Sequence, residues 1–199
     1  MAKIVGITGI SGAGKTFVSR ALAKKLNRAT VVFWDEYDDL KQNPTIAPSD
    51  YVEWYRRGGN YEEWKTDSLE ATLKHLKNGK SILCPVTRKV LEPSPYIIFD
   101  TGLGYYHRQT GQYIDYLVFL DTPLDICLCR RVIRDFSKEG GSTSGKEILE
   151  DLSFYLEQSR PLFQLPYQDR KYDFAIDGMK SVDEIVSTIM EQLEIGVRI

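Results

Sequence analysis

The chain has 199 residues, of which 26 are Lys or Arg and 28 are Asp or Glu, so its formal net charge is -2. This balance excludes a general nucleic-acid binder, which usually carries a basic excess, and the ordinary hydrophobic share of 42% excludes a disordered chain. No apolar run approaches the roughly 18 residues of a membrane span, and 3 cysteines are too few for a disulfide scaffold. We expect a single cytoplasmic domain over residues 1–199, with reduced thiols and with no membrane or nucleic-acid partner.

Short apolar runs alternate with longer amphipathic segments along the chain. In the first half of the chain, the pattern predicts a strand over residues 3–8, a helix over 15–26, a strand over 30–34, a loop over 35–46 and helices over 49–57 and 61–76. Strands follow over 81–84, 96–99 and 116–120, and then a helix over 123–136. The last part is predicted to contain a flexible segment over 139–145, a helix over 146–163, a short strand over 174–176 and a helix over 182–193. Because strands that are apolar on both faces need cover on both sides, we expect a central five-stranded parallel sheet between two helical layers.

The most specific motif follows the first predicted strand and fits the pattern G-x-x-x-x-G-K-[ST] of a phosphate-binding P-loop. Its residues are Gly9, Ile10, Ser11, Gly12, Ala13, Gly14, Lys15 and Thr16. The glycines let several backbone N–H groups face one phosphate, and the start of the following helix favours negative charge. Lys15 is expected to reach the β- and γ-phosphates, while the hydroxyl of Thr16 ligates Mg²⁺. The motif predicts a nucleoside triphosphate with Mg²⁺, and together with the alternating strands and helices it predicts an adenylate-kinase-like P-loop α/β fold, a three-layer sandwich.

Two carboxylates stand at the ends of predicted strands. Asp35 follows the second strand, and Asp100 follows the strand over 96–99. Asp35 is placed to accept a proton from an attacking hydroxyl or to hold the water of a metal ion, and Asp100 to orient Mg²⁺. The alternative for both is an ordinary turn or helix-capping acid.

Three arginines follow the strand over 116–120. They are Arg130, Arg131 and Arg134, spaced so that their side chains cluster on one face of the predicted helix. Arginines there would cover the transferring phosphate, with Arg134 catalytic and Arg131 touching both ATP and acceptor. Glycines in the 139–145 segment would supply the bend of a mobile lid over about 125–145. The alternative is a solvated helix face on which the arginines pair with Asp125 and Asp135.

An aromatic-rich insert separates the second and third predicted strands. It contains Trp34, Tyr37, Trp54, Tyr55, Tyr61 and Trp64. These rings either form a stacking wall for a planar substrate, to which Tyr37, Trp64 and the more distant Tyr105 would contribute, or pack the helices. For His75 and His107, a surface or hydrogen-bonded role is favoured over catalysis.

The sequence resembles the P-loop small-molecule kinases of the uridine kinase, phosphoribulokinase and nicotinamide riboside kinase group. Four segments carry the resemblance over most of the chain: Gly6 to Thr16, Asp35-Glu36-Tyr37-Asp38, Val118 to Asp135, and Ser159-Arg160-Pro161-Leu162 with Lys171-Tyr172-Asp173. It implies that Asp35 is the catalytic base, that Lys15 and Thr16 serve the phosphates and Mg²⁺, and that Arg131 and Arg134 are lid contacts. Asp100 stands where the family often has Glu.

Two segments depart from the family pattern. Residues 138–143 replace the second pair of lid arginines, and Pro85-Val86-Thr87-Arg88 replaces the Pro-x-Tyr-Asp segment that meets the base in uridine kinases. The resemblance therefore supports the phosphate-donor machinery further than the acceptor site.

Taken together, these features predict an ATP- and Mg²⁺-dependent kinase that phosphorylates a hydroxyl of a small molecule. A nucleoside or related metabolite is the first candidate acceptor, and pantothenate-like or sugar acceptors are alternatives. The chain lacks the N-K-x-D motif of a guanine-binding switch protein, so the competing class is a P-loop ATPase or nucleotide-binding regulatory module that acts with a protein partner.

Overall fold

The computed structural model describes residues 1–27, 29–38, 50–137, 144–160 and 170–195. Five parallel strands form its central sheet in the order β2-β5-β1-β6-β7. These strands are β1 (Lys3–Thr8), β2 (Thr30–Phe33), β5 (Tyr96–Asp100), β6 (Tyr116–Asp121) and β7 (Phe174–Asp177). The predicted five-stranded parallel sheet is confirmed.

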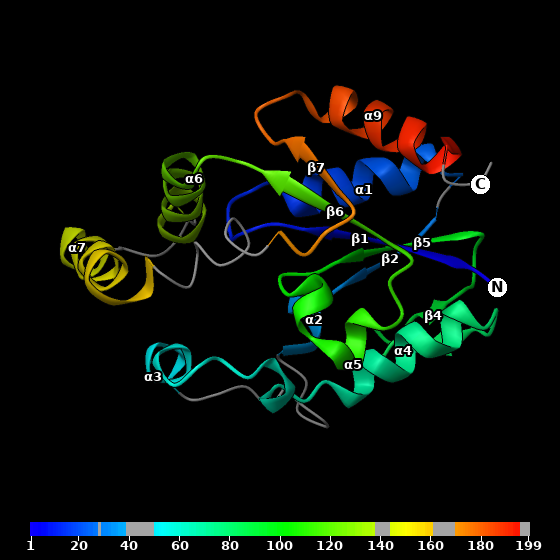
Figure 1. The fold of residues 1–199 in the computed structure, drawn as a ribbon, viewed down its shortest axis with the longest axis horizontal. Coiled ribbons are helices and arrows are strands. Elements are labelled where there is room, and N and C mark those ends of the chain that lie inside the picture. The colour runs from blue at the N-terminus through cyan, green and yellow to red at the C-terminus, as the bar shows by residue number, and fades with distance from the viewer. Residues whose placement is uncertain (28, 39–49, 138–143, 161–169, 196–199) are drawn as a thin grey trace.

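Helices cover both faces of this sheet, as Figure 1 shows. One face is covered by α1 (Lys15–Lys25) and α9 (Val182–Ile195), the other by α4 (Asp67–Lys77) and the short α5 (Arg108–Gly111). The helices bury Leu22 and Ile189 on the first face and Leu69 and Leu73 on the second, all with an exposed fraction of 0%. Each face of the central strands thus meets a hydrophobic core, which is why these strands are apolar on both sides.

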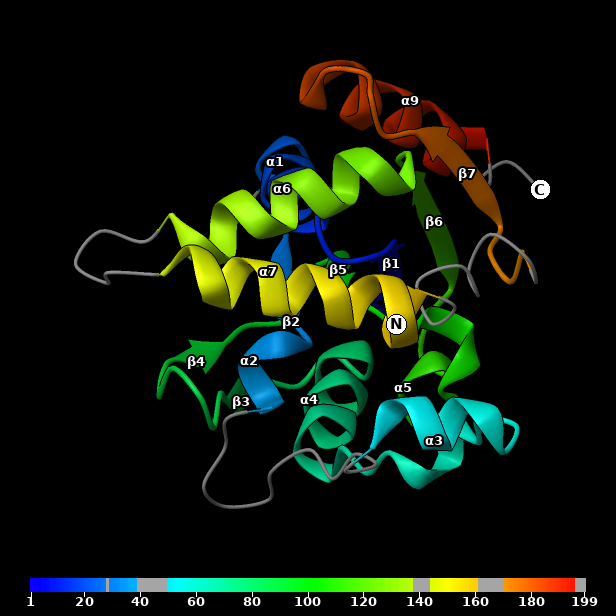
Figure 2. The same ribbon diagram turned by 90° about the vertical axis from the view of Figure 1, so that its left-hand side faces the viewer.

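The remaining elements belong neither to the central sheet nor to these four helices. They are α2 (Asp35–Asp38), α3 (Tyr51–Arg56), the 3₁₀ turn η1 (Tyr61–Glu63), β3 (Ile82–Leu83), β4 (Val90–Leu91), the 3₁₀ turn η2 (Gly104–Tyr106), α6 (Leu124–Phe136), α7 (Gly145–Phe154) and the π-helical turn η3 (Tyr155–Ser159). Figure 2 shows α6 and α7 side by side at one end of the molecule, with α3 on the other side of α7.

The strand predicted over 81–84 does not join the central sheet. Its residues in β3 pair with β4 in an antiparallel hairpin. The turn between them is closed by backbone hydrogen bonds from Cys84 to Lys89 and from Arg88 to Cys84, of 2.8 and 3.0 Å. Because this turn sends the chain straight back, the hairpin strands pair with each other, and β7 is the fifth strand of the sheet.

The helix predicted over 61–76 is two elements, η1 and α4. Between them, the backbone N–H and the hydroxyl of Thr66 donate to Oε1 of Gln109 at 2.9 and 3.2 Å, and the carbonyl of Trp64 accepts from Nε2 of His107 at 3.0 Å. These bonds to α5 and the residue before it replace the bonds of a continuous helix, so the prediction of one helix is wrong.

The ends of three other predicted segments also differ. The helix predicted to start at residue 49 begins at Tyr51, and Asp50 caps it by accepting from the backbone N–H of Glu53 at 2.9 Å. The helix predicted over 146–163 gives way to η3 after Phe154. The predicted loop over 35–46 begins with the helical turn α2. Residues 39–49, residues 139–143 of the flexible segment predicted over 139–145, and residues 161–163 lie outside the described chain, while Ser144 is the N-cap of α7 and Gly145 its first residue.

Candidate active site

The P-loop connects β1 to α1 and curls tightly against another part of the fold. Gly12 has a φ of +91° and lies so close to α6 that an added Cβ would stand 2.2 Å from the carbonyl oxygen of Cys127. A side chain here would meet backbone that cannot move aside, so the loop needs glycine at this position. The contact also fixes the start of α6 next to the phosphate-binding loop.

Lys15, the first residue of α1, folds back onto the loop. Its Nζ donates to the carbonyl oxygens of Gly9 and Ile10 at 2.9 and 3.3 Å. Burial lowers the pKa of Lys15, while the nearby charges of Asp100 and Asp35 act in the opposite direction. The ammonium group is therefore held inside the loop, close to where the motif places the β- and γ-phosphates.

Thr16 and Asp100 meet although 84 residues separate them in the chain. The Thr16 hydroxyl donates to Oδ2 of Asp100 at 2.9 Å. Asp100 is the last residue of β5, which pairs with β1, and it is only 5% exposed. Burial raises the pKa of its carboxyl group, while the charge of Lys15 and the hydrogen bond from Thr16 act to lower that pKa. The predicted partners of Mg²⁺ are thus adjacent.

This pair of oxygen donors fits a magnesium ion. Mg²⁺ commonly takes one or two protein oxygens and completes its octahedron with phosphate oxygens and water. In the described ranges no group of three or more His, Cys, Asp or Glu side chains could hold a metal ion. The arrangement thus suits a metal ion that binds together with a nucleotide more than an all-protein metal site.

Asp35 lies at the neighbouring strand end. It is the first residue of α2, two positions after β2 ends at Phe33, which is in register with Asp100 of β5. Its side chain is exposed and lines the same pocket as Lys15 and Thr16. The carboxyl edge of the parallel sheet therefore brings together the two predicted site acids and the P-loop, as expected for ligand sites in such folds.

The pocket over the P-loop has a volume of about 930 Å³. Residues 9–18, which include the P-loop, line one part of the pocket. A second part is lined by Asp35, Tyr61, Gly102, Leu103 and Tyr106, and a third by Arg130, Ile133 and Arg134 of α6. The last part is lined by residues that follow β7, namely Gly178, Lys180, Val182 and Ile185. One space of this size therefore joins the phosphate-binding loop to an aromatic region and to an apolar region.

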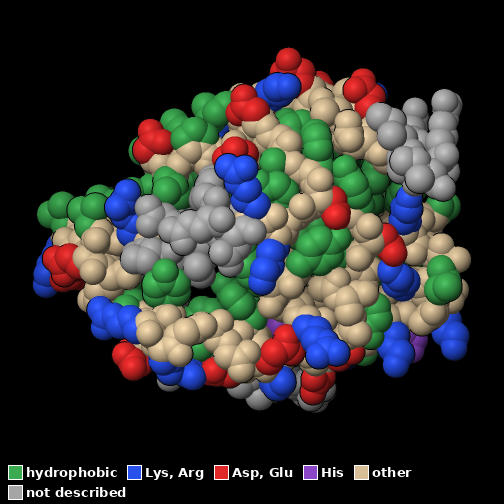
Figure 3. Space-filling view, in the orientation of Figure 1, with side chains coloured by type: hydrophobic (Ala, Val, Ile, Leu, Met, Phe, Trp, Pro, Cys, Tyr) green, Lys and Arg blue, Asp and Glu red, His purple; other side chains and the backbone are tan. Residues whose placement is uncertain are grey.

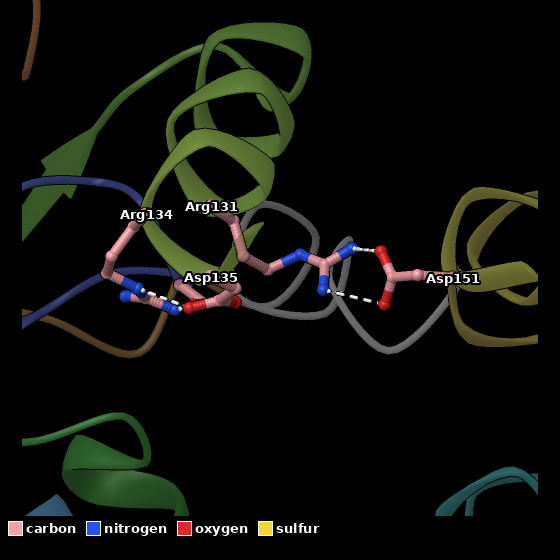
Figure 4. A network of polar contacts seen from close by, with 5 residues as sticks. Arg131, Arg134, Asp135 and Asp151 are labelled. Carbon is pink, nitrogen blue, oxygen red and sulfur yellow. Dashed lines mark hydrogen bonds and ion pairs between the residues drawn. The ribbon is translucent and has the colours of Figure 1, made fainter. Parts of the chain in front are cut away.

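The lid arginines extend in different directions from α6. Arg134 lines the pocket, where its Nη2 donates to Oγ of Ser11 at 3.2 Å, and it also binds the carboxylate of Asp135 through Nε at 2.8 Å. Hydrogen bonding to Asp135 raises the pKa of Arg134, which therefore stays charged. Arg131 points to α7 and pairs with Asp151 (Figure 4).

Arg131 therefore does not occupy the place predicted for it. It lies outside the residues that line the pocket, whereas Arg130, predicted only as one member of the arginine cluster, lies among them. The expectation that Arg131 and Arg134 share one face fails because Asp151 of α7 draws the Arg131 guanidinium away from the P-loop. In this structure Arg131 therefore does not face the pocket in which ATP and the acceptor are expected to bind.

Most aromatic residues of the insert pack the fold. Tyr37 is 2% exposed, and its hydroxyl donates to Oγ1 of Thr72 at 3.1 Å. Trp64 packs edge-on against Trp54, with ring centroids 6.0 Å apart. Neither Tyr37 nor Trp64 lines the pocket, so the structure does not bring these two predicted acceptor contacts to it.

Tyr106, and not the predicted Tyr105, lines the pocket. The hydroxyl of Tyr105 donates to Oδ2 of Asp173 at 2.6 Å, away from the pocket, while Tyr106 lines the pocket next to Tyr61, with ring centroids 5.4 Å apart. Adjacent residues in the 3₁₀ turn η2 point in different directions, and sequence alone did not indicate which tyrosine faces the site. His107 is fully buried and hydrogen-bonded to Thr110 and Trp64.

Sequence reasoning also missed the pocket residues after β7, Gly178, Lys180, Val182 and Ile185. A signal for them was present, because the segment follows a strand of the parallel sheet, and ligands bind at the carboxyl ends of such strands. The same rule predicted Asp35 after β2 and Asp100 at the end of β5. It would also have indicated the residues after β7 if it had been applied to that strand.

The parallel sheet with its P-loop, Thr16–Asp100 pair and Asp35 defines a P-loop kinase fold. The model of the phosphoribulokinase/uridine kinase family matches residues 4–158, and the chain belongs to this family. Members of the family are ATP-dependent phosphotransferases, and this chain is a phosphotransferase of that class, acting on a small molecule.

Several uridine kinases are similar in sequence. Those of Yersinia enterocolitica and Haemophilus influenzae are 30% and 29% identical, each over 80% of this chain and 78% of the relative. The uridine kinase of Schizosaccharomyces pombe is 28% identical over 97% of this chain, which spans only 45% of that longer protein. In fold, the chain is similar to the shikimate kinase of Acinetobacter baumannii solved with shikimate (TM-score 0.51, 18% identity, 98% of this chain and 95% of the other).

Two further observations concern the distribution of charge on the surface and the length and polarity of the helices. Basic and acidic side chains are interspersed over the described part of the face shown in Figure 3. Among the described residues, no helix is both long and apolar enough to cross a bilayer.

Proposed function

We propose that this protein uses ATP and Mg²⁺ to phosphorylate a hydroxyl group of a nucleoside or a related small metabolite. The observation that carries this proposal is the meeting of Lys15, Thr16 and Asp35 at one pocket, at the carboxyl edge of the sheet, with Asp100 hydrogen-bonded to Thr16. We further propose that residues 1–199 act as one kinase domain in the cytoplasm, with the region of about 125–145 as its lid.

The phosphate end of the reaction would depend on the P-loop. Its backbone N–H groups and Lys15 would bind the β- and γ-phosphates, and Arg134, already 3.2 Å from Ser11 of the loop, would offset charge that develops during transfer. Thr16 and Asp100 would hold Mg²⁺, which would supply positive charge to offset the negative charge of the phosphates.

The acceptor end would depend on Asp35 and the aromatic wall. Asp35 is exposed in the pocket, so it is free to receive the proton of the attacking hydroxyl. Tyr61 and Tyr106 line the same pocket and offer a surface on which a planar base can stack. These two tyrosines favour a nucleoside over a sugar as acceptor.

ADP release from ATP in the presence and absence of candidate acceptors tests this function. We expect release to rise at least about tenfold over the acceptor-free rate when a suitable nucleoside is present. A panel of nucleosides, pantothenate and sugars identifies the acceptor class. Slow release that no acceptor accelerates would contradict the kinase proposal and favour an ATPase or regulatory module acting with a protein partner.

We expect Asp100→Asn to weaken the dependence on magnesium more than the binding of acceptor. The amide keeps the shape and one oxygen, but it lacks the negative charge that holds a divalent ion beside Thr16. The free Mg²⁺ concentration for half-maximal rate should rise about tenfold, because a hydrogen-bonded charge commonly contributes about 1.5 kcal/mol or more. A titration of Mg²⁺ at fixed ATP measures this. An unchanged midpoint would remove Asp100 from the metal site.

A further inference from the structure

Helix α7 has little packing to fix its position. None of its side chains is buried, and Leu149 and Phe154 are 66% and 49% exposed. The helix is well formed at its start, where Ser144 and Glu147 make a capping box. Local bonds therefore stabilise α7 as a helix, but apolar burial does not determine where it lies.

Helix α7 nevertheless lies next to two elements that are related to the pocket, α6, which lines it, and α3, whose Trp54 packs against the pocket residue Tyr61 with ring centroids 4.9 Å apart. It lies between α6 and α3 in the views of Figures 1 and 2. On one side, α6 contributes Arg130, Ile133 and Arg134 to the pocket. On the other, α7 continues into η3, which contacts α3 in the aromatic insert and buries Tyr155 to an exposed fraction of 6%. The position of α7 therefore relates the phosphate side of the site to the acceptor side.

The contact that joins α7 to α6 is a two-pronged ion pair. Nη1 and Nη2 of Arg131 donate to Oδ1 and Oδ2 of Asp151 at 3.0 and 2.6 Å (Figure 4). The side chains are only 16% and 27% exposed, so water screens this pair less than an ordinary surface pair. Two parallel hydrogen bonds fix the orientation as well as the distance of the two groups.

We propose that Arg131 and Asp151 form a brace that holds α7 against α6 and so sets the position of α6 beside the P-loop. Arg131 is then a positioning residue, and Arg134, three residues further along α6, is the arginine that faces the P-loop. The brace adds an ion pair between helices to the partial burial of Ile148 and Leu152, the two apolar side chains of α7 that are half-buried. The kinetic part of this inference rests on the proposed kinase function, while the structural part does not.

Reversing the charges separates this brace from a direct contact between Arg131 and phosphate. The variants are Arg131→Asp, Asp151→Arg, the double variant with both changes, and the isosteric Asp151→Asn. Hydrogen exchange of the amides in 145–154 is measured without ligand, and kcat and KM are measured with ATP and the acceptor found in the ADP-release panel.

We expect each single change to speed exchange in 145–154 about tenfold, the effect of losing a charged hydrogen-bond pair of about 1.4 kcal/mol. The same variants should lower kcat severalfold. The double variant restores an ion pair of opposite polarity, so both quantities should return to within about twofold of wild type.

The exposed ion pair of Lys146 and Glu150 provides the matched control. It lies on the same helix, with an N–O distance of 3.5 Å and side-chain exposures of 82% and 65%. Glu150→Gln should leave exchange and kinetics unchanged, since such pairs contribute little. A control that speeds exchange as much as Asp151→Asn would overturn the brace, because any loss of charge on α7 would then suffice.

The proposal also fails if Asp151→Asn behaves as wild type while the double variant remains as impaired as Arg131→Asp. That pattern would mean that Arg131 acts on the ligand. Failure of the proposed function looks different: wild type would phosphorylate no acceptor, and the exchange measurements would still decide whether the brace exists.

Discussion

Replacing Lys15 by Ala should lower kcat about 10³-fold, near the upper end of what one lost electrostatic contact to a transition state costs. The ammonium group of Lys15 is held in the P-loop by the carbonyl oxygens of Gly9 and Ile10, where phosphate would bind. Its charge offsets the negative charge that builds up on the phosphates during transfer, and no other side chain of the loop carries a positive charge.

The fold should survive this change. Burial lowers the pKa of Lys15, which means that folding disfavours its charged form. Lys15→Met, which keeps the length without the charge, should therefore unfold at the same temperature as wild type or higher while losing activity to the same extent. Steady-state rates and thermal unfolding measure the two effects.

Lys24→Ala supplies the control for this prediction. Lys24 is an exposed residue near the end of the same helix, so its removal should change neither rate nor stability by a measurable amount. If Lys15→Ala retained the wild-type rate with ATP, the assignment of the P-loop as the phosphate site would be wrong.

The second large effect is expected at Asp35. Asp35→Asn preserves size and hydrogen bonding but cannot accept a proton, so kcat should fall by about 10²-fold or more, the usual contribution of a general base. The apparent affinity for ATP should change little, because the P-loop, Lys15 and the Thr16–Asp100 pair remain in place. Initial rates with ATP and acceptor varied separately give both quantities.

Asp38→Asn tests whether any lost charge in this short helix has the same effect. Asp38 is exposed and belongs to α2 like Asp35, but it does not line the pocket. Its substitution should leave kcat near wild type. Collapse of ATP binding in Asp35→Asn, with near-normal turnover at saturating ATP, would instead identify Asp35 as a metal or structural residue.

Features carried by consecutive residues were predictable. The P-loop spacing in 9–16, the apolar strands and the helix that follows residue 123 each depend on neighbours in the chain, and the structure confirms the resulting fold class. Asp35 and Asp100 could be placed at the site for a related reason. In a parallel sheet the carboxyl ends of all strands lie at one edge, so a strand end in the sequence already indicates the side of the sheet.

Predictions failed where groups outside a predicted element bind its backbone. The helix over 61–76 is interrupted because Gln109 and His107 bind the backbone at Thr66 and Trp64. The strand predicted over 81–84 is not part of the central sheet, because the turn that follows it pairs β3 with β4. In the first place a contact with residues distant in the chain decided the outcome, and in the second the pairing with the next strand did.

The sequence by itself determined the class of this protein, because a phosphate-binding loop and the strands that carry its acids are short, contiguous patterns. Only the tertiary structure decided which side chains face the pocket. Tyr106 enters it while Tyr105 bonds to Asp173, and Arg134 enters it while Arg131 turns to Asp151. The direction of each long side chain depends on the nearest partner of suitable charge or polarity. Here Asp173 and Asp151 stand 68 and 20 residues away along the chain and become neighbours only on folding.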